Sequence, residues 1–357
     1  MTAERMLEQL REYMLGPTRF MNVLCCFDLG IVDELRRRPG LAAEQLGAAV
    51  GAAPDAVEQL LHLLVKDDLV AYDEEAGTYS LDGLAAIADD DLQRVLAIMN
   101  MTRMVVLRQG FYLTESVRTA RPVGLREFYS HDGNLYEALA EHRELRDAWG
   151  TMMDTVTAHI DPWFFGNIEI PAGARVLDLA GNTGLGAILT HRLAASPGLH
   201  VTTFDLPEKE DDCLRNFKAA GLDERCSFIG GDVFQQVPEG FDVVLIKHFV
   251  DMFDRKEVHQ ILSNTYQALN AGGRLYILGP VYPENIKDSY AVDFFPAYFL
   301  GATMGRGGPQ KLSTYQRWLE ECGFSITHAA AQDLVELPAD ALVAHGILGA
   351  TKPAQVM

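Results

Sequence analysis

Apolar positions recur at helical spacing through the first 100 residues. Met6, Leu7, Leu10 and Met14 lie three or four residues apart, and a second apolar run begins after Gly16-Pro17, where we expect the helix to break. Helices are predicted over residues 42–50 and 54–66, and strands over 69–72 and 78–81, joined by a polar turn. Helix, turn, helix and hairpin in this order predict a winged-helix domain.

Residues 101–165 are predicted to be helical, with polar breaks at 119–124 and 130–133. Aromatic and methionine side chains are dense here, and they suit either core packing or the wall of a pocket for an aromatic ligand. Residues 280–308 add a predicted helix and a glycine-rich loop that covers the pocket, forms a dimer contact or does both. The candidate substrate contacts from the two regions are Trp149, Met153, Phe295, Phe299 and Met304.

The pattern changes at residue 174 to alternating buried strands and helices. Repeated βα units predict an α/β fold, with a doubly wound, mainly parallel Rossmann-like sheet. We therefore divide the chain into a winged-helix domain (1–100), a helical linker and substrate-pocket region (101–165) and a sheet domain (166–357). The predicted strands span 175–179, 200–206, 226–230, 242–248, 274–281, 325–331 and 342–351.

The charge of the chain narrows the classes of partner. Among 357 residues, 50 are Asp or Glu and 30 are Lys or Arg, which gives a formal net charge of −20. This balance disfavours nucleic acid and anionic membrane surfaces and suits an enzyme with a small substrate. The predicted helix 54–66 carries Asp55 and Glu58 and no basic residue before Lys66, which is unsuited to reading DNA. We expect this domain to be a scaffold for a homodimer.

The cysteine and histidine patterns argue against a disulfide framework and against a metal site. Five cysteines without CxxC spacing indicate reduced thiols in the cytoplasm, and the charged N-terminus does not resemble a signal peptide. Ten histidines show neither HxxxH nor HExxH spacing, so we expect no metal.

Polar and glycine residues follow three successive strands at the edge where open α/β sheets bind ligands. The first turn reads V-L-D-L-A-G-N-T-G-L-G over residues 176–186, Asp205 ends the second strand, and Gly-Gly-Asp follows the third at 230–232. Asp205 is placed to accept hydrogen bonds from ribose hydroxyls. Asp178, before the first glycine, opposes a phosphate but suits a cation, which favours S-adenosylmethionine (SAM) over NAD.

These segments, together with L-I-K-H-F-V-D-M-F-D-R and L-N-A-G-G-R-L-Y-I-L, resemble the class I SAM-dependent O-methyltransferases of the dimeric type. That family includes plant caffeate methyltransferases and bacterial enzymes that tailor natural products. The resemblance implies that Asp178 and Gly181 lie near the methionine end of SAM, Asp205 binds the ribose, and Phe253 replaces an adenine-stacking tryptophan. The positions that match the family's cofactor contacts are Asp178, Gly181, Asp205, Leu206, Asp232, Val233, Lys247 and Phe253.

The chain departs from the family at the catalytic base. Asp251 stands where the family has a histidine, and the family's two acidic partners align near Gly279 and near Lys311. His248 lies three residues earlier and is a second candidate. Two hypotheses remain: methyl transfer driven by proximity and by Asp251, or a non-methylating reaction such as hydroxylation, decarboxylation or pericyclic closure, with SAM as an electrostatic element.

Overall fold

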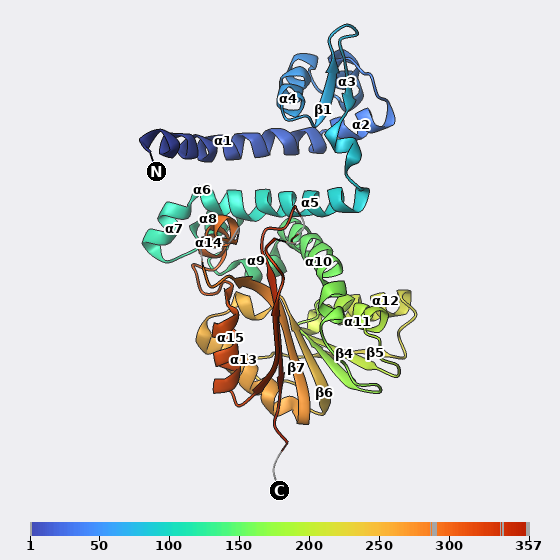
Figure 1. The fold of residues 1–357 in the computed structure, drawn as a ribbon, viewed down its shortest axis with the longest axis vertical. Coiled ribbons are helices and arrows are strands. Elements are labelled where there is room, and N and C mark those ends of the chain that lie inside the picture. Colours follow the sequence, from blue (N-terminus) through green and yellow to red (C-terminus); the bar gives the residue numbers. More distant parts are fainter. Residues whose placement is uncertain (1, 286, 288–290, 336, 338, 355–357) are drawn as a thin grey trace. The chain divides into compact units, whose positions relative to one another are not determined.

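The computed structural model describes residues 2–285, 287, 291–335, 337 and 339–354. It divides into two compact units, Met1–Met99 and Asn100–Met357, which we describe separately (Figure 1). The predicted region 101–165 lies entirely within the second unit.

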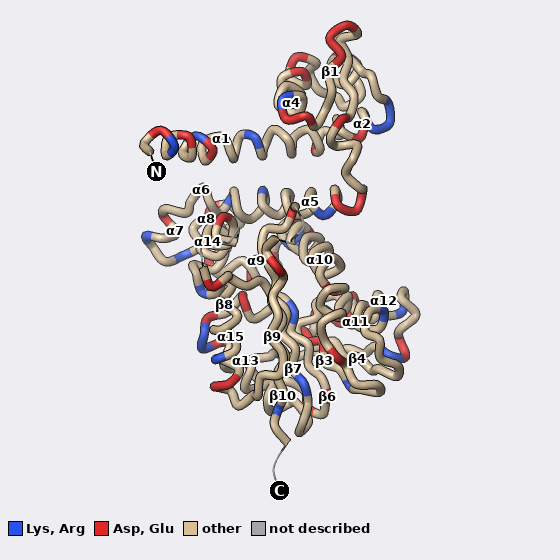
Figure 2. The backbone as a smooth tube through the Cα atoms, viewed as in Figure 1, with Lys and Arg blue, Asp and Glu red and all other residues tan. Residues whose placement is uncertain are grey.

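The first unit contains the predicted helix–turn–helix and hairpin. Leu46, Leu61 and Leu64 form the centre of its core and are fully buried. Figure 2 colours the acidic positions on and around α4 (Pro54–Lys66), the second helix of the motif, red. The elements are α1 (Ala3–Asp28), α2 (Ile31–Arg37), α3 (Ala43–Val50), α4 (Pro54–Lys66), β1 (Val70–Asp73), β2 (Thr78–Leu81), η1 (Gly83–Ala86) and α5 (Asp89–Met101), whose last two residues belong to the second unit.

The break expected at Gly16-Pro17 is wrong, because α1 continues through both residues. A proline inside a helix removes one N–H group and so leaves one carbonyl, here that of Tyr13, without its helical donor. Tyr13 is 67% exposed, so water can reach this part of the helix. The usual penalty is therefore reduced, and the exposed helix tolerates the pair.

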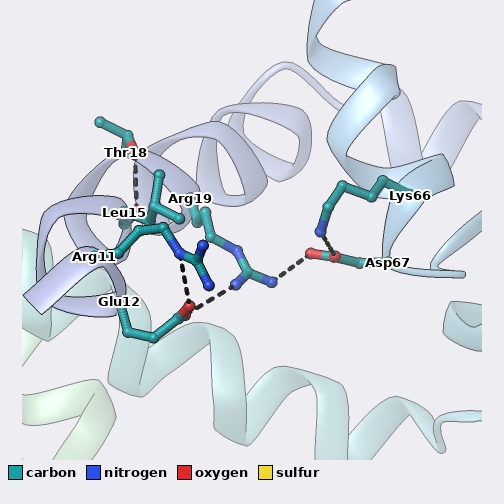
Figure 3. A network of polar contacts seen from close by, with 7 residues as sticks. All are labelled: Arg11, Glu12, Leu15, Thr18, Arg19, Lys66 and Asp67. Carbon is teal, nitrogen blue, oxygen red and sulfur yellow. Dashed lines mark hydrogen bonds and ion pairs between the residues drawn. The ribbon is translucent and has the colours of Figure 1, made fainter. Parts of the chain in front are cut away.

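A charged network ties α1 to the end of α4 (Figure 3). Arg19 of α1 lies 2.8 Å from Asp67, which also accepts a hydrogen bond of 2.9 Å from Lys66. These two cations lower the pKa of Asp67, with Lys66 the larger cause. Glu12 lies 3.9 Å from Arg19 and extends the network along the helix. All of these groups are near the surface, so the network fixes geometry more than it stabilises the fold.

The second unit is built on a twisted sheet with strand order β5-β4-β3-β6-β7-β10-β9, and β8 pairs with the end of β7. Neighbours from β5 to β7 are parallel, and β10 runs antiparallel to both β7 and β9. The strands are β3 (Arg175–Leu179), β4 (His200–Asp205), β5 (Cys226–Gly230), β6 (Phe241–Lys247), β7 (Leu269–Tyr282), β8 (Gln310–Lys311), β9 (Ser325–Ala331) and β10 (His345–Thr351).

Helices cover both faces of this sheet (Figure 1). Helices α10 (Arg143–Gly166), α11 (Leu185–Leu193) and α12 (Glu210–Ala219) pack on one face, where Phe164 and Phe217 are fully buried. Helices α13 (Arg255–Ala268) and α15 (Leu312–Glu321) pack on the other. The chain moves outward in both directions from β3 and β6, so the topological switch point lies between these two strands.

Short helices complete the unit around a separate apolar cluster that contains Met104, Leu125 and Phe299. Within the described residues no single helix is long and apolar enough to span a membrane, although α1 and α2, bent by 52°, pass together by length and composition. The remaining elements are η2 (Thr102–Leu107), α6 (Arg108–Phe111), α7 (Leu113–Thr119), α8 (Val123–Tyr129), α9 (Leu135–Glu141), η3 (Pro207–Lys209), η4 (Val250–Met252) and α14 (Ala291–Ala302).

Candidate active site

A cavity of about 900 Å³ opens at the carboxyl ends of β3, β4 and β6, beside α9 and α10. It lies at the switch point, where a doubly wound sheet leaves room for a ligand. Its wall contains every residue that the sequence places at the cofactor site: Asp178, Gly181, Asp205, Leu206, Asp232, Val233, Lys247 and Phe253.

The turn after β3 is held in a sharply bent conformation that aims the carboxylate of Asp205. Ala180 and Asn182 both have positive φ, of 59° and 50°, a region where side chains are disfavoured. In this conformation the backbone N–H of Asn182 donates a 2.8 Å hydrogen bond to Asp205 Oδ2, and the N–H of Leu206 donates one of 2.7 Å to Asp205 Oδ1. Both carboxylate oxygens are thus oriented before any ligand arrives.

Asp178, at the end of β3, is a buried carboxyl in the floor of the cavity, only 1% exposed. Burial raises its pKa to about 6, although Lys247 opposes this shift. A side chain at Gly181 would collide with Asp178 Oδ2, so this glycine gives a ligand access to the carboxyl. Asp178 Oδ2 has no hydrogen-bond partner within the described part of the chain.

Sequence analysis did not identify Asp161 of α10, whose Oδ2 lies 2.6 Å from Lys247 Nζ. The pair is buried, with 0% of the Asp161 side chain and 7% of the Lys247 side chain exposed. These residues lie far apart along the chain, so spacing cannot connect them. The one local signal is a carboxylate inside the apolar helical run Ile160-Asp161-Pro162-Trp163.

The opposite end of the cavity has an aromatic wall and a carboxylate. Asp232 Oδ1 accepts a 2.9 Å hydrogen bond from the backbone N–H of Phe234. The ring of Phe253 meets Phe234 and Phe249 edge to face, with centroids 5.2 Å and 4.9 Å away. This wall suits a flat heterocycle.

The candidate substrate contacts divide into two groups. Trp149 and Met153 of α10 line the cavity. Phe295 and Phe299 do not line it and instead pack with the apolar cluster of the short helices. Met304 also lies outside the cavity wall, in a turn after α14 where its φ is +58°. Tyr136, one of the aromatic residues of the region 101–165 but not among the predicted substrate contacts, lines the cavity and meets Trp149 edge to face at 6.1 Å.

The two candidate catalytic residues lie in different surroundings. His248 lines the cavity with a positive φ of 50°, and its ring meets that of His345 at 5.1 Å. Burial lowers its pKa well below the usual value, so the ring is neutral. Asp251, in η4, is not in the cavity wall, and burial raises its pKa to about 6. The described residues provide no hydrogen-bond partner for its Oδ1.

Comparison with known families identifies the chain. An O-methyltransferase domain model matches residues 112–325, and an O-methyltransferase dimerisation domain model matches residues 11–88. The chain belongs to the O-methyltransferase family. This membership places it among the methyltransferases, a class that uses SAM as its cofactor, and the expected α/β fold with a winged-helix N-terminal domain is confirmed.

Similar methyltransferases span nearly the whole chain. L-tyrosine C(3)-methyltransferase of Streptomyces lavendulae is 23% identical over 97% of this chain and 93% of its own length. The 3-amino-4-hydroxybenzoate 4-O-methyltransferase of Streptomyces cremeus is 26% identical over 89% and 85%. The structure of human N-acetylserotonin methyltransferase in complex with SAM superposes with a TM-score of 0.81, at 19% identity over 99% of this chain and 100% of that one.

The charges of the cavity fit SAM, which carries an ammonium and a sulfonium and no phosphate. Three basic residues, Arg146, Lys209 and Lys247, share its wall with a larger set of acidic ones. Such an excess of carboxylates favours a cation. The acidic residues of the wall are Asp147, Asp154, Asp178, Asp205, Glu208, Asp212 and Asp232.

Proposed function

We propose that this methyltransferase transfers the methyl group of SAM to a small aromatic, or a polyketide- or peptide-derived, acceptor of secondary metabolism. The observation that carries the proposal is one continuous cavity, in which the cofactor residues at the strand ends adjoin Tyr136, Trp149 and Met153. Rigid aromatic walls suit an aromatic acceptor. The names of two relatives, a tyrosine and an aminohydroxybenzoate methyltransferase, support this class of acceptor.

In the proposed reaction SAM supplies the methyl group and the protein positions the acceptor and receives its proton. Asp251 is the proposed base or orienting acceptor, with a pKa of about 6 that keeps it mostly ionised at neutral pH. Burial is the main cause that raises the pKa of the Tyr136 and Tyr298 hydroxyls, and the charge of Asp251 raises both further. A base of this strength suits an acidic phenol or an aromatic amine better than a simple phenol.

A non-methylating reaction is the second candidate function. It is favoured by the residues that stand at the family's base positions. Gly279 has open space beyond its backbone, and the ammonium group of Lys311 lies 3.2 Å from Glu284. The neutral His248 ring would then act only as a hydrogen-bonding group in a dry pocket that the SAM cation polarises.

We further propose a homodimer formed through the N-terminal unit. The dimerisation domain match supports it, and so does an exposed apolar row on α1, where Leu7, Leu10 and Met14 are 67%, 54% and 69% exposed. The acidic α4 supports the absence of a nucleic-acid partner, and the net charge of −20 supports the absence of a membrane partner. The proposed location is the cytoplasm.

Asp251→Asn with SAM labelled on its methyl group tests the reaction. Aromatic amines, aminophenols and phenols are offered as acceptors, and mass spectrometry follows label in the product. We expect the variant to transfer label about 10²–10⁴-fold more slowly at unchanged SAM affinity, because an amide cannot accept the proton. Asp293→Asn, at an exposed site on α14, is the control. Product formation without label would establish the second function instead.

Asp251→His extends the test. It restores the family's base but not the acidic partners, which are Gly279 and Lys311 here. We expect only a partial gain on simple phenols, because nothing fixes the tautomer of the new imidazole. A full gain would contradict the idea that the acidic partners matter.

A further inference from the structure

Two buried carboxylates share one ammonium group beneath the cofactor cavity. Lys247 Nζ lies 2.6 Å from Asp161 Oδ2. A Cβ atom at Gly186 would lie 2.6 Å from Asp178 Oδ2 and 3.0 Å from Lys247 Nζ, so all three groups converge at the start of α11. Lys247 also lies 5.7 Å above the ring of Phe165, which closes the cluster from below.

Each carboxylate of the cluster has one oxygen that accepts no hydrogen bond from the residues described. Asp161 Oδ1 and Asp178 Oδ2 are both buried and meet no hydrogen-bond partner among the residues described. Buried carboxylate oxygens are expensive to leave without a donor. Asp178 faces the cavity, whereas Asp161 lies behind Lys247 and outside the cavity wall. Two carboxylates therefore face one ammonium group, and Asp178 is the one of the two that lines the cavity.

We propose that Asp161 is a positioning residue that holds Lys247 away from Asp178, so that the ammonium group of SAM completes the cluster and displaces a proton from it. The inference rests on the proposed placement of the methionine end of the cofactor at Asp178. Asp161 itself touches no ligand and acts through Lys247. This gives a buried residue of α10 a role in cofactor recognition.

The ionisation behaviour of the cluster supports the proposal. Burial raises the pKa of Asp178 to about 6 and also raises that of Asp161, while Lys247 lowers both. Burial keeps the thiols of Cys213 and Cys226 neutral, with a pKa of about 12, and keeps the imidazole of His248 neutral by lowering its pKa. The further titratable groups facing the cluster are Asp205 from β4, Cys213 from α12, Cys226 from β5 and His248 after β6.

The proposal fixes the sign of a pH effect. Below pH 6 the cluster of Asp161, Asp178 and Lys247 holds a proton, which competes with the entering ammonium group. Affinity for the cofactor should therefore rise by up to about tenfold per pH unit as the pH approaches 6, and level off above it.

Calorimetric titration of the full-length protein with S-adenosylhomocysteine (SAH) tests this without any turnover. Titrations at pH 5.0 to 7.5, each in two buffers of different ionisation enthalpy, give both the affinity and the number of protons released. We expect about half a proton released near pH 6 and close to none at pH 7.5. Methylthioadenosine, which lacks the amino-acid group, should release none. Equal release with both ligands, or none with SAH, would overturn the proposal.

Two variants separate positioning from folding. In Asp161→Asn, Lys247 is free to neutralise Asp178, so SAH affinity at pH 7.5 should fall about tenfold or more and lose its pH dependence. Asp161→Glu keeps the charge and should retain proton release. Glu144→Gln removes an equal charge from the same helix at a side chain 70% exposed and serves as the matched control. If SAH affinity in Asp161→Asn depends on pH as it does in the wild type, the positioning role is refuted. If that variant does not fold, proton release by the wild type with SAH and with methylthioadenosine still tests the proposal.

The outcomes also separate this inference from the proposed function. Proton-coupled SAH binding without transfer of labelled methyl would remove the proposed function and leave the cluster intact. Methyl transfer with pH-independent SAH binding would do the reverse.

Discussion

Replacing Asp178 by Asn should make the cofactor-free protein more stable while it weakens cofactor binding. Asp178 is 1% exposed, and its pKa rises from 3.8 to about 6 on folding. The folded state therefore binds the proton more tightly than the unfolded state, so the stabilisation is complete at low pH and is lost as the pH rises through about 6. The upward shift of about two pKa units corresponds to about 3 kcal/mol of folding stability lost at pH 7, and replacing the carboxylate by a neutral amide would restore it.

Urea unfolding measured by tryptophan fluorescence suits this test, because Trp149, Trp163 and Trp318 all lie in the second unit. Unfolding curves are recorded from pH 4 to 8 without cofactor. The difference between Asp178→Asn and the wild type should be small at pH 4 and reach about 3 kcal/mol above pH 7. Asp223→Asn, at an exposed carboxylate, should show no such trend.

Two results would refute this reasoning. A variant less stable than the wild type at pH 7 would mean that the attraction of Lys247 outweighs the cost of burying the Asp178 charge. A stability difference that does not change with pH would mean that Asp178 titrates normally. In either case SAH titration of the variant still reports on binding, and we expect affinity to fall about 10²-fold because a buried charged partner is lost.

Four further results are expected. Gly186→Ala should weaken SAH binding at least about tenfold in calorimetry, since its Cβ would lie 2.6 Å from Asp178 Oδ2. The turnover number should rise with pH through about 6 and then level, because Asp251 must be ionised to accept a proton, and Asp251→Asn should remove that step from the pH–rate profile. Arg19→Ala should lower the unfolding free energy by less than about 1 kcal/mol in calorimetric melting, because this side chain is 43% exposed. Leu10→Asp should convert the dimer to monomers in light scattering, and an unchanged mass would count against α1 as the contact.

The sequence predicts the strands of the large sheet well because each is an apolar run ended by a polar turn. The strands 175–179 and 226–230 agree residue for residue with β3 and β5. Their carboxyl ends must meet at one edge, so the cofactor residues could be placed together without a structure. The winged-helix elements follow equally well from their turn signals.

Long-range relationships are what the sequence does not reveal. Asp161 and Lys247 meet because α10 packs across the sheet, and no periodicity records that contact. Phe295 and Phe299 are aromatic residues of the kind that line pockets, yet they lie on α14 and pack with the apolar cluster of the short helices. Apolar character is the same in a core and in a pocket, so only packing separates the two.

Helix α10 carries Trp149 at the acceptor end of the cavity and Asp161 beneath the cofactor end, about 18 Å apart along its axis. The helix runs between them without a loop, although Pro162 removes its backbone hydrogen bond to the carbonyl of Ala158. A ligand that shifts one end of the helix and thereby moves the other would link the two binding events thermodynamically. Reciprocity then requires SAM and the acceptor to change each other's dissociation constant by the same factor. Such linkage would appear as a SAM dissociation constant that changes with the concentration of the acceptor, whichever of the two binds first.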